Sequence, residues 1–141
     1  MDKYNAEGYP DPTAAEALKN VTREEKEKQE RRLIYVCSPY SGETQFNTRR
    51  ARGYSLFVVS KGHVPLAPHL LFPQFLDEEN KEQRELGLSY ALFLLQKCNA
   101  IWVFGSKVTD GMSREIIEAK KHNIPIKYFN ERCVEVKSIW K

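Results

Sequence analysis

The stretch Ala100-Ile-Trp-Val-Phe-Gly-Ser-Lys-Val-Thr-Asp-Gly-Met-Ser-Arg-Glu-Ile-Ile-Glu-Ala119 decides the fold expected for this chain. Its first five residues are apolar and end at Gly105, which predicts a short buried strand. A polar turn follows, and a helix begins after it, capped by Thr109 or Asp110; one face of that helix carries Met112, Ile116 and Ala119. A strand, a loop and a helix N-terminus in this order build half of an anion site at the carboxyl end of a parallel sheet.

Glu115 lies about one turn into the predicted helix. The helix dipole favours a negative charge in that first turn. Two interpretations stay open on spacing alone: the carboxylate faces a ligand above the loop, or it is a solvated first-turn glutamate.

Composition restricts the class of protein. The chain has 141 residues, 29% charged and 41% hydrophobic, which suits one globular domain. A net charge of +3 is too small to argue for nucleic acid, and no apolar run approaches the ~20 residues that cross a bilayer. The polar N-terminus lacks a signal-peptide core, so we expect a cytoplasmic protein with no membrane partner.

Three cysteines, Cys37, Cys98 and Cys133, have no paired spacing. We expect reduced thiols, with Cys37 and Cys98 buried beside core strands. Neither Cys-x-x-Cys nor His-x-x-x-His occurs, so no metal and no cofactor are expected.

Residues 1–32 form a predicted N-terminal extension, and residues 33–141 a predicted α/β domain. A charged helix is expected over about 14–32, with a thin apolar stripe of Ala14, Ala17, Leu18 and Val21. We expect this helix to lie on the domain or on a neighbouring subunit and then to run out as a solvated rod. Acidic residues interleaved with the basic ones argue against a nucleic-acid arm.

The rest of the chain alternates between predicted strands and helices. Strands are expected at 33–37, at 63–68 with two prolines that suit an edge, at 125–129, and at 133–140, perhaps at another edge. Helices are expected at 43–61, ended by Gly62, and at 85–97, after a charged connection over 77–84. This alternation predicts a single Rossmann- or flavodoxin-like three-layer domain, with a parallel sheet of about four or five strands.

Two segments can contribute polar groups beside the strand ends. Ser38-Pro-Tyr-Ser-Gly42 is a tight loop whose hydroxyl and backbone N–H groups can face an anion. His69 follows the second strand, beside an apolar segment expected to cover the site as a short helix or loop. It is either a substrate contact or a structural histidine.

These segments resemble the nucleoside 2-deoxyribosyltransferase-like superfamily, and most closely its DUF4406 and DUF7768 groups, which occur in bacteria and phages. The resemblance covers about 33–129. The stretches that carry it are Ile34-Tyr-Val-Cys-Ser-Pro-Tyr40, Gly62-His-Val-Pro-Leu-Ala-Pro-His69, Cys98-Asn-Ala-Ile-Trp-Val-Phe-Gly105 and Thr109-Asp-Gly-Met-Ser-Arg-Glu115.

The resemblance implies a reaction on a nucleoside or nucleotide. Glu115 would be the nucleophile that attacks C1′ of the deoxyribose, and Tyr35 would orient its carboxylate. Thr109 stands where nucleoside transferases carry an aspartate and nucleotide-hydrolysing relatives a serine, which favours a 5′-monophosphate. The other expected substrate contacts are Ser38, Tyr40, Ser41, Gly42, His69, Gly111 and Met112.

One position departs from the superfamily. Its active enzymes carry an aspartate that helps the base to leave, and the matching position here is Ala91. His69, Asp77 or Glu85 can replace that acid, or a second subunit can supply one, since the superfamily completes its sites within homo-oligomers. Three hypotheses therefore remain: an N-glycosidase or deoxyribosyltransferase, a nucleotide sensor that has lost the chemistry, and a scaffold organised by the N-terminal helix.

Overall fold

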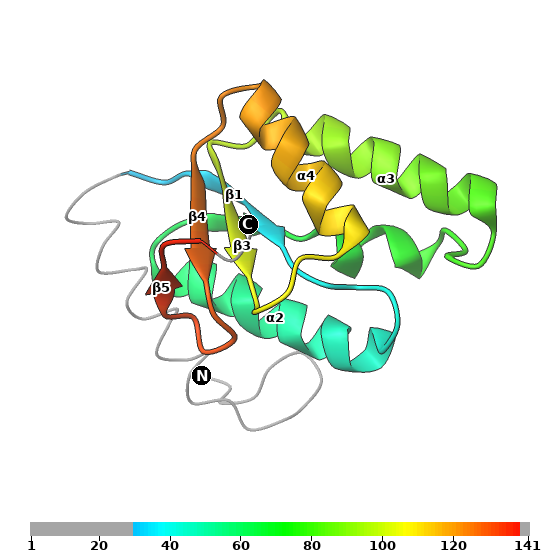
Figure 1. The fold of residues 1–141 in the computed structure, drawn as a ribbon, viewed down its shortest axis with the longest axis horizontal. Coiled ribbons are helices and arrows are strands. Elements are labelled where there is room, and N and C mark those ends of the chain that lie inside the picture. Colours follow the sequence, from blue (N-terminus) through cyan, green and yellow to red (C-terminus); the bar gives the residue numbers. More distant parts are fainter. Residues whose placement is uncertain (1–29, 139–141) are drawn as a thin grey trace, which may run out of the picture.

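Five strands form one sheet in the order β2-β1-β3-β4-β5, in a computed structural model that describes residues 30–138 (Figure 1). The strands are β1 (Leu33–Cys37), β2 (Val64–Leu66), β3 (Ala100–Phe104), β4 (Ile126–Phe129) and β5 (Glu135–Val136). The helices are α2 (Thr44–Ser60), α3 (Lys81–Leu95) and α4 (Asp110–Lys121), with two short 3₁₀ turns, η1 (Pro68–Leu70) and η2 (Phe72–Gln74). The charged helix expected over about 14–32 lies outside the described residues except at 30–32, which have no regular structure.

The first four strands are parallel, as the alternation of strands and helices predicted. β1 pairs with both β2 and β3, and β3 pairs with β4. β2, which contains Pro65, lies at one edge of the sheet, and its edge position confirms the prediction made from its prolines.

The last strand is shorter than predicted and runs antiparallel to β4. The side-chain oxygen of Asn130 accepts hydrogen bonds from the backbone N–H groups of Arg132 (2.8 Å) and Val134 (3.1 Å), and Cys133 adopts a positive φ of 62°. This tight turn reverses the chain directly beside β4. Of the described residues only two then pair, so the strand predicted over 133–140 begins later and ends earlier than expected, and its last two positions lie outside the described residues.

Two separate cores lie on the two faces of the sheet, which confirms the three-layer architecture. Strand residues alternate between the faces. On one face Ile34, Val36, Trp102 and Phe104 pack with residues of α2, among them Tyr54 and Val58. On the other, Tyr35, Cys37, Ile101 and Val103 pack with α3 and α4, through Ala91, Leu95, Met112, Ile116 and Ala119.

Helix ends follow local capping rules, with one correction to the expected boundaries. Gly62 has a φ of 86° just after α2, as a residue that ends a helix should. α3 begins at Lys81, about a turn earlier than predicted, because Asn80 caps it by accepting a hydrogen bond from the Gln83 backbone N–H (3.0 Å). Half of the expected charged connection is therefore helical.

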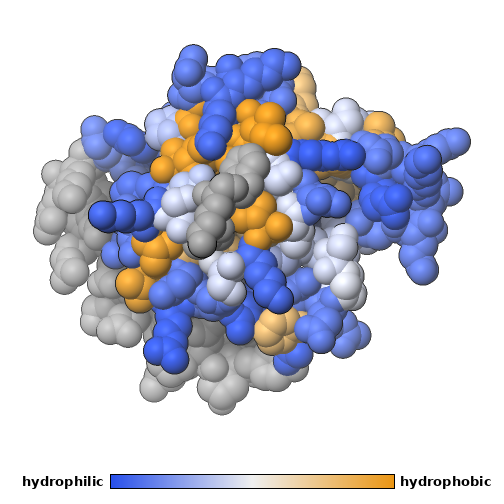
Figure 2. Space-filling model, in the orientation of Figure 1, coloured by the Kyte–Doolittle hydropathy of each residue, from blue (hydrophilic) through white to orange (hydrophobic). Residues whose placement is uncertain are grey.

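The face of the molecule seen in Figure 2 is mostly hydrophilic, with hydrophobic surface gathered near its centre over the strands. Between residues 30 and 138, none of the helices combines the length and the apolar character that a bilayer crossing requires.

Candidate active site

The candidate site lies at the carboxyl ends of β1 and β3, which are neighbours in the sheet. The loop after β1 leads into α2, and the loop after β3 leads into α4. Thr109 caps α4, because its side-chain oxygen accepts a hydrogen bond from the Met112 backbone N–H (3.2 Å). This cap fixes the first turn of α4 over the strand ends and sets the direction of Glu115, one turn further on.

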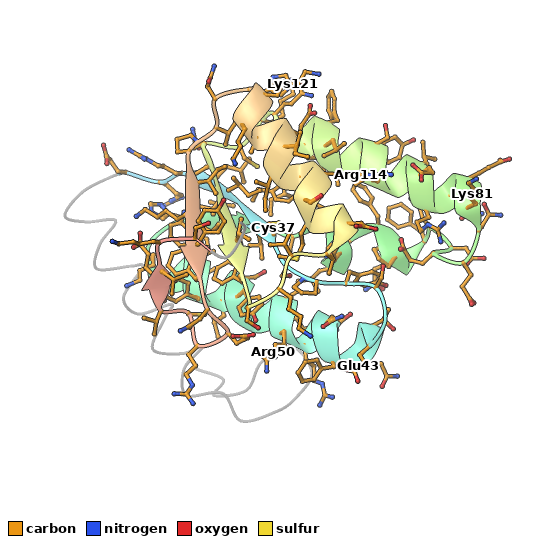
Figure 3. The ribbon with its side chains drawn as sticks, viewed as in Figure 1. Cys37, Glu43, Arg50, Lys81, Arg114 and Lys121 are labelled. Atoms are coloured by element: carbon orange, nitrogen blue, oxygen red, sulfur yellow. The ribbon has the colours of Figure 1, made fainter. Side chains whose placement is uncertain are left out.

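Glu115 is a buried carboxylate held by two donors from β1. The Tyr35 hydroxyl donates a hydrogen bond to Oε2 of Glu115, and the Cys37 thiol donates one to Oε1 over 3.3 Å. Glu115 is only 2% exposed, and Tyr35 and Cys37 are fully buried. The structure therefore contradicts the interpretation of Glu115 as a solvated first-turn residue. Figure 3 labels Cys37, the last residue of β1, and Arg114, which lies on α4 and precedes Glu115 in the sequence.

Burial is the largest influence on the pKa values of Glu115, Tyr35 and Cys37. It raises the pKa of Glu115 to about 7, although the hydrogen bonds from Tyr35 and Cys37 act in the opposite direction. Burial, followed by the neighbouring Glu115 carboxylate, raises the pKa of both Tyr35 and Cys37 well above their ordinary values. Tyr35 and Cys37 thus stay protonated as donors, while Glu115 changes its charge near neutral pH.

A cavity of about 490 Å³ opens beside Glu115, which is one of its lining residues. One side is formed by Tyr40 and Ser41 of the loop after β1, together with Pro68, His69, Phe72 and Pro73 of the two 3₁₀ turns. Another is formed by Gly87, Leu88 and Ala91 of α3, and the first turns of α4 contribute Thr109, Asp110, Gly111 and Met112. A volume of this size is within the usual range for a small-molecule site.

An aromatic pair forms part of the cavity wall. The rings of Tyr40 and His69 lie 5.0 Å apart between centroids, at an angle of 39°. Burial lowers the pKa of His69 to about 4, so its imidazole is neutral at pH 7. A neutral imidazole beside a phenol ring offers a flat surface and hydrogen-bonding nitrogens to a ligand, but it is a poor proton donor at that pH.

Charged side chains of both signs line the rest of the cavity. Arg84 of α3 and Arg114 of α4 are the basic members, and Glu78, Glu85 and Asp110 are the acidic ones besides Glu115. Nη1 of Arg114 lies 3.6 Å from Oε2 of Glu85. This ion pair is exposed to solvent and therefore contributes little to the stability of the fold. Burial raises the pKa of Glu78, an effect that Arg84 opposes and Asp77 reinforces.

The residues expected to contact substrate do not all reach the cavity. Tyr40, Ser41, His69, Thr109, Gly111 and Met112 line it, and so does Glu115. Tyr35 lies outside the lining and touches Glu115 from the core. Ser38 is 1% exposed with no hydrogen-bond partner for its hydroxyl, and neither Ser38 nor Gly42 belongs to the lining. Their expected role as phosphate contacts therefore has no support from the shape of the cavity.

Several lining residues had not been predicted: Glu78, Arg84, Asp110 and Arg114. Glu78 precedes α3 and Arg84 lies in its first turn, and both belong to the segment that was expected to be a charged connection. The cap at Asn80 is the sequence signal that would have placed Arg84 on a helix. The contact of Cys37 with Glu115 was also missed, although residues two apart on a strand share a face, as Tyr35 and Cys37 do.

Ala91 lines the cavity at the position where the resemblance expects a carboxylate. Of the three candidate replacements, Glu85 lines the cavity, His69 lines it but is neutral near pH 7, and Asp77 does not reach it. Across residues 30–138, no group of three or more His, Cys, Asp or Glu side chains is arranged to hold a metal ion.

Known proteins resemble this chain in fold and in family. A family model, "Domain of unknown function (DUF7768)", matches residues 32–129. A solved 2-deoxyribosyltransferase from the psychrotolerant bacterium Bacillus psychrosaccharolyticus superposes with a TM-score of 0.56 at 17% identity, covering 76% of this chain and 77% of the other. At that identity the likeness shows a shared fold. No curated protein sequence matches the chain, and the expected link to the DUF4406 group stays a prediction.

Proposed function

The chain belongs to the DUF7768 domain family, and from the site that it carries we propose that it cleaves the N-glycosidic bond of a 2′-deoxynucleoside 5′-monophosphate. It would do so as a hydrolase or as a deoxyribosyltransferase. One observation carries the proposal: a buried carboxylate, Glu115, accepts a hydrogen bond from a buried phenol, Tyr35, beside a cavity of about 490 Å³.

The proposed reaction has two steps. In the first, the ionised carboxylate of Glu115 attacks C1′ while the bond from C1′ to the base nitrogen breaks. The electron pair of that bond leaves with the base, which takes up a proton. In the second, water attacks C1′ and loses a proton, the bond to Glu115 breaks, and the carboxylate regains its charge. In a transferase, a second base takes the place of water.

Tyr35 and the pKa of Glu115 fit these requirements. A nucleophile must be ionised yet poorly solvated, and a group with a pKa of about 7 is half ionised near neutral pH. The phenol stays protonated and donates a hydrogen bond to Oε2. It can therefore orient the carboxylate and stabilise its charge without acting as a second nucleophile toward the sugar.

The leaving base needs a proton donor, and Glu78 is the best candidate in the cavity. Ala91 cannot donate, and His69 is already neutral at pH 7. Glu78 lines the cavity, and burial raises its pKa, which favours the protonated form that a general acid needs. This assignment takes the place of the acid that the superfamily carries at the position of Ala91.

The start of α4 and two arginines support a phosphate on the substrate. Thr109 and Gly111 line the cavity there, and the first amides of a helix have no acceptor within it, so they can bind an anion. Arg84 and Arg114 add two positive charges to the same cavity. One guanidinium group can donate two parallel hydrogen bonds to the oxygens of a phosphate.

The test is a panel of 2′-deoxynucleoside 5′-monophosphates carrying the four DNA bases, with release of free base measured by chromatography. Wild-type protein should release base, and Glu115→Gln should abolish release. Glu118→Gln is the matched control, because Glu118 lies on the same helix but pairs with His122 (2.9 Å) away from the cavity. Equal base release by the Glu115→Gln protein would reject the mechanism.

A second candidate function is nucleotide binding without cleavage, and the apolar Ala91 in the cavity wall favours it. A sensor of this kind would release no base but would be stabilised by the nucleotide. Ligand at about 100 times its Kd adds about 2.7 kcal/mol to the free energy of unfolding. A thermal shift without base release would therefore select this alternative.

We also propose that the protein self-associates. Three large apolar side chains on α3, Leu86, Tyr90 and Phe93, are 41%, 44% and 58% exposed and follow helical spacing. Replacing Tyr90 and Phe93 by glutamate should lower the molar mass measured by light scattering. An unchanged mass would show that this face is not the contact.

A further inference from the structure

The two oxygens of Glu115 have different hydrogen-bond donors. Oε2 accepts from the phenol of Tyr35, and Oε1 accepts from the thiol of Cys37, with sulfur and oxygen 3.3 Å apart. A phenol is a good donor, whereas a thiol is a weak one. The negative charge of the ionised carboxylate is therefore stabilised more at Oε2 than at Oε1.

Burial makes this difference important. Cys37 is fully buried and Glu115 nearly so, and an interaction between such groups is stronger than the same interaction in water. Burial also raises the pKa of the Cys37 thiol well above its ordinary value, so the thiol remains a donor and does not become a competing nucleophile.

We propose that Cys37 is a positioning residue whose thiol fixes Oε1 of Glu115 while leaving that oxygen the more basic of the two, so that Oε1 is the atom that attacks C1′. The identification of the attacking atom rests on the proposed function. The effect of Cys37 on the carboxylate does not, because it follows from the contact itself. A serine at this position would hold Oε1 but stabilise its charge more strongly, and an alanine would leave it without this donor.

Other titratable groups lie around the cavity that Glu115 lines, and they remain the same in every variant compared below. The titratable and charged residues that line the same cavity are Tyr40, His69, Glu78, Arg84 and Glu85, together with Asp110 and Arg114 of its own helix. Tyr35 donates from the core side. A change in titration that depends on the atom at position 37 can therefore be assigned to that position.

The first test measures the titration of the carboxyl group directly. Protein labelled with ¹³C at the glutamate side-chain carboxyl is titrated by NMR, and the Glu115 signal is the one missing from Glu115→Gln. Cys37→Ala should raise the midpoint by up to about half a pH unit, and Cys37→Ser should lower it by about half a unit to one unit, since a donor to the charged form lowers a pKa.

Cys98→Ser and Cys98→Ala are the matched controls, because Cys98 is buried in the same core but donates to the Leu94 carbonyl (3.5 Å). They should leave the midpoint in place. Equal midpoints for cysteine, serine and alanine at position 37 would overturn the proposal even if all these proteins fold, and so would a shift of the same size in the Cys98 variants.

The second test uses the reaction. If base release is observed, the acid limb of the kcat/KM profile should move in the same order, lowest in pH for serine and highest for alanine. Cys37→Ser should also be slower than wild type above that limb, since its attacking oxygen is less basic. A serine variant as fast as wild type there would overturn the identification of Oε1. If no base is released by any protein, the proposed function fails, and the NMR titration still decides the role of Cys37.

Discussion

The phenol of Tyr35 donates a hydrogen bond to Oε2 of Glu115, although the two residues are 80 positions apart in the chain. One comes from a central strand and the other from the helix that covers it, so the contact depends on how these two layers pack.

Replacing Tyr35 by phenylalanine removes the hydroxyl and keeps the ring in the core. We expect the pKa of Glu115 to rise above about 7, because burial is then opposed by the Cys37 thiol alone. Base release at pH 7 should fall on the order of 10- to 100-fold, from a lost hydrogen bond to a charged group. A pH–rate profile checks this, and an acid limb that does not move would contradict it.

Replacing Glu115 by glutamine should change how stability depends on pH. The pKa of Glu115 is about 7 in the folded protein against an ordinary value of 4.5, so between these values the folded state holds the proton more tightly than the unfolded state. Stability from this group is greatest at low pH, falls as pH rises from 4.5 to 7, and then levels off.

Between pH 5 and pH 8, we therefore expect Glu115→Gln to gain roughly 2–3 kcal/mol in the free energy of unfolding relative to wild type. Urea unfolding at the two pH values measures the difference. If the free energy of unfolding changed by the same amount in wild type and in Glu115→Gln between the two pH values, Glu115 would titrate near its ordinary value.

Replacing Glu78 by glutamine tests the leaving-group acid. We expect kcat to fall by about 10²- to 10⁴-fold for natural bases, which must be protonated as they leave. A deoxyribosyl 5′-phosphate with a nitrophenolate leaving group should be cleaved almost normally, because that group needs no proton. Glu79→Gln is the control, since Glu79 is exposed and does not line the cavity. An equal loss on both substrates would assign Glu78 a different role.

Replacing Arg114 by glutamine tests whether the cavity binds a phosphate. The expected result is a KM about tenfold or more higher for 5′-monophosphates, with little change for the matching nucleosides, because a charge-assisted hydrogen bond is lost. Lys121→Gln, at the far end of α4, removes the same charge away from the cavity (Figure 3). A similar loss on nucleosides would show that Arg114 does not contact the phosphate.

Local sequence patterns were sufficient to predict most of the fold. Short stretches of sequence determine three of its features. These are β3 with Gly105 at its end, the cap of α4 at Thr109, and the end of α2 at Gly62. The start of α3 was predicted about one turn too late. Its first turn is dense in charged residues and was interpreted as a loop, although Asn80 is a typical helix cap. The length of β5 was missed because the turn at Asn130 and Cys133, and not the alternation of side chains, determines where pairing begins.

The site was predictable where it lies on regular elements. Tyr35 and Glu115 were placed together because they match the tyrosine and the glutamate of the superfamily that the sequence resembles, and the two side chains are in contact. Glu78 and Arg84 lie in and beside the connection before α3, whose path depends on tertiary packing, and so the sequence did not place them. Cys37 was correctly expected to be buried, but its contact requires knowing which face of the sheet α4 covers.

The two outermost strands also affect how the molecule behaves when it is concentrated. β2 has three residues and includes Pro65, which lacks a backbone N–H, and β5 has only two residues. A foreign chain that adds to a sheet needs a row of free backbone donors and acceptors, as in amyloid growth. Within residues 30–138, neither edge strand provides a long row of this kind, which disfavours the addition of a foreign strand to either edge.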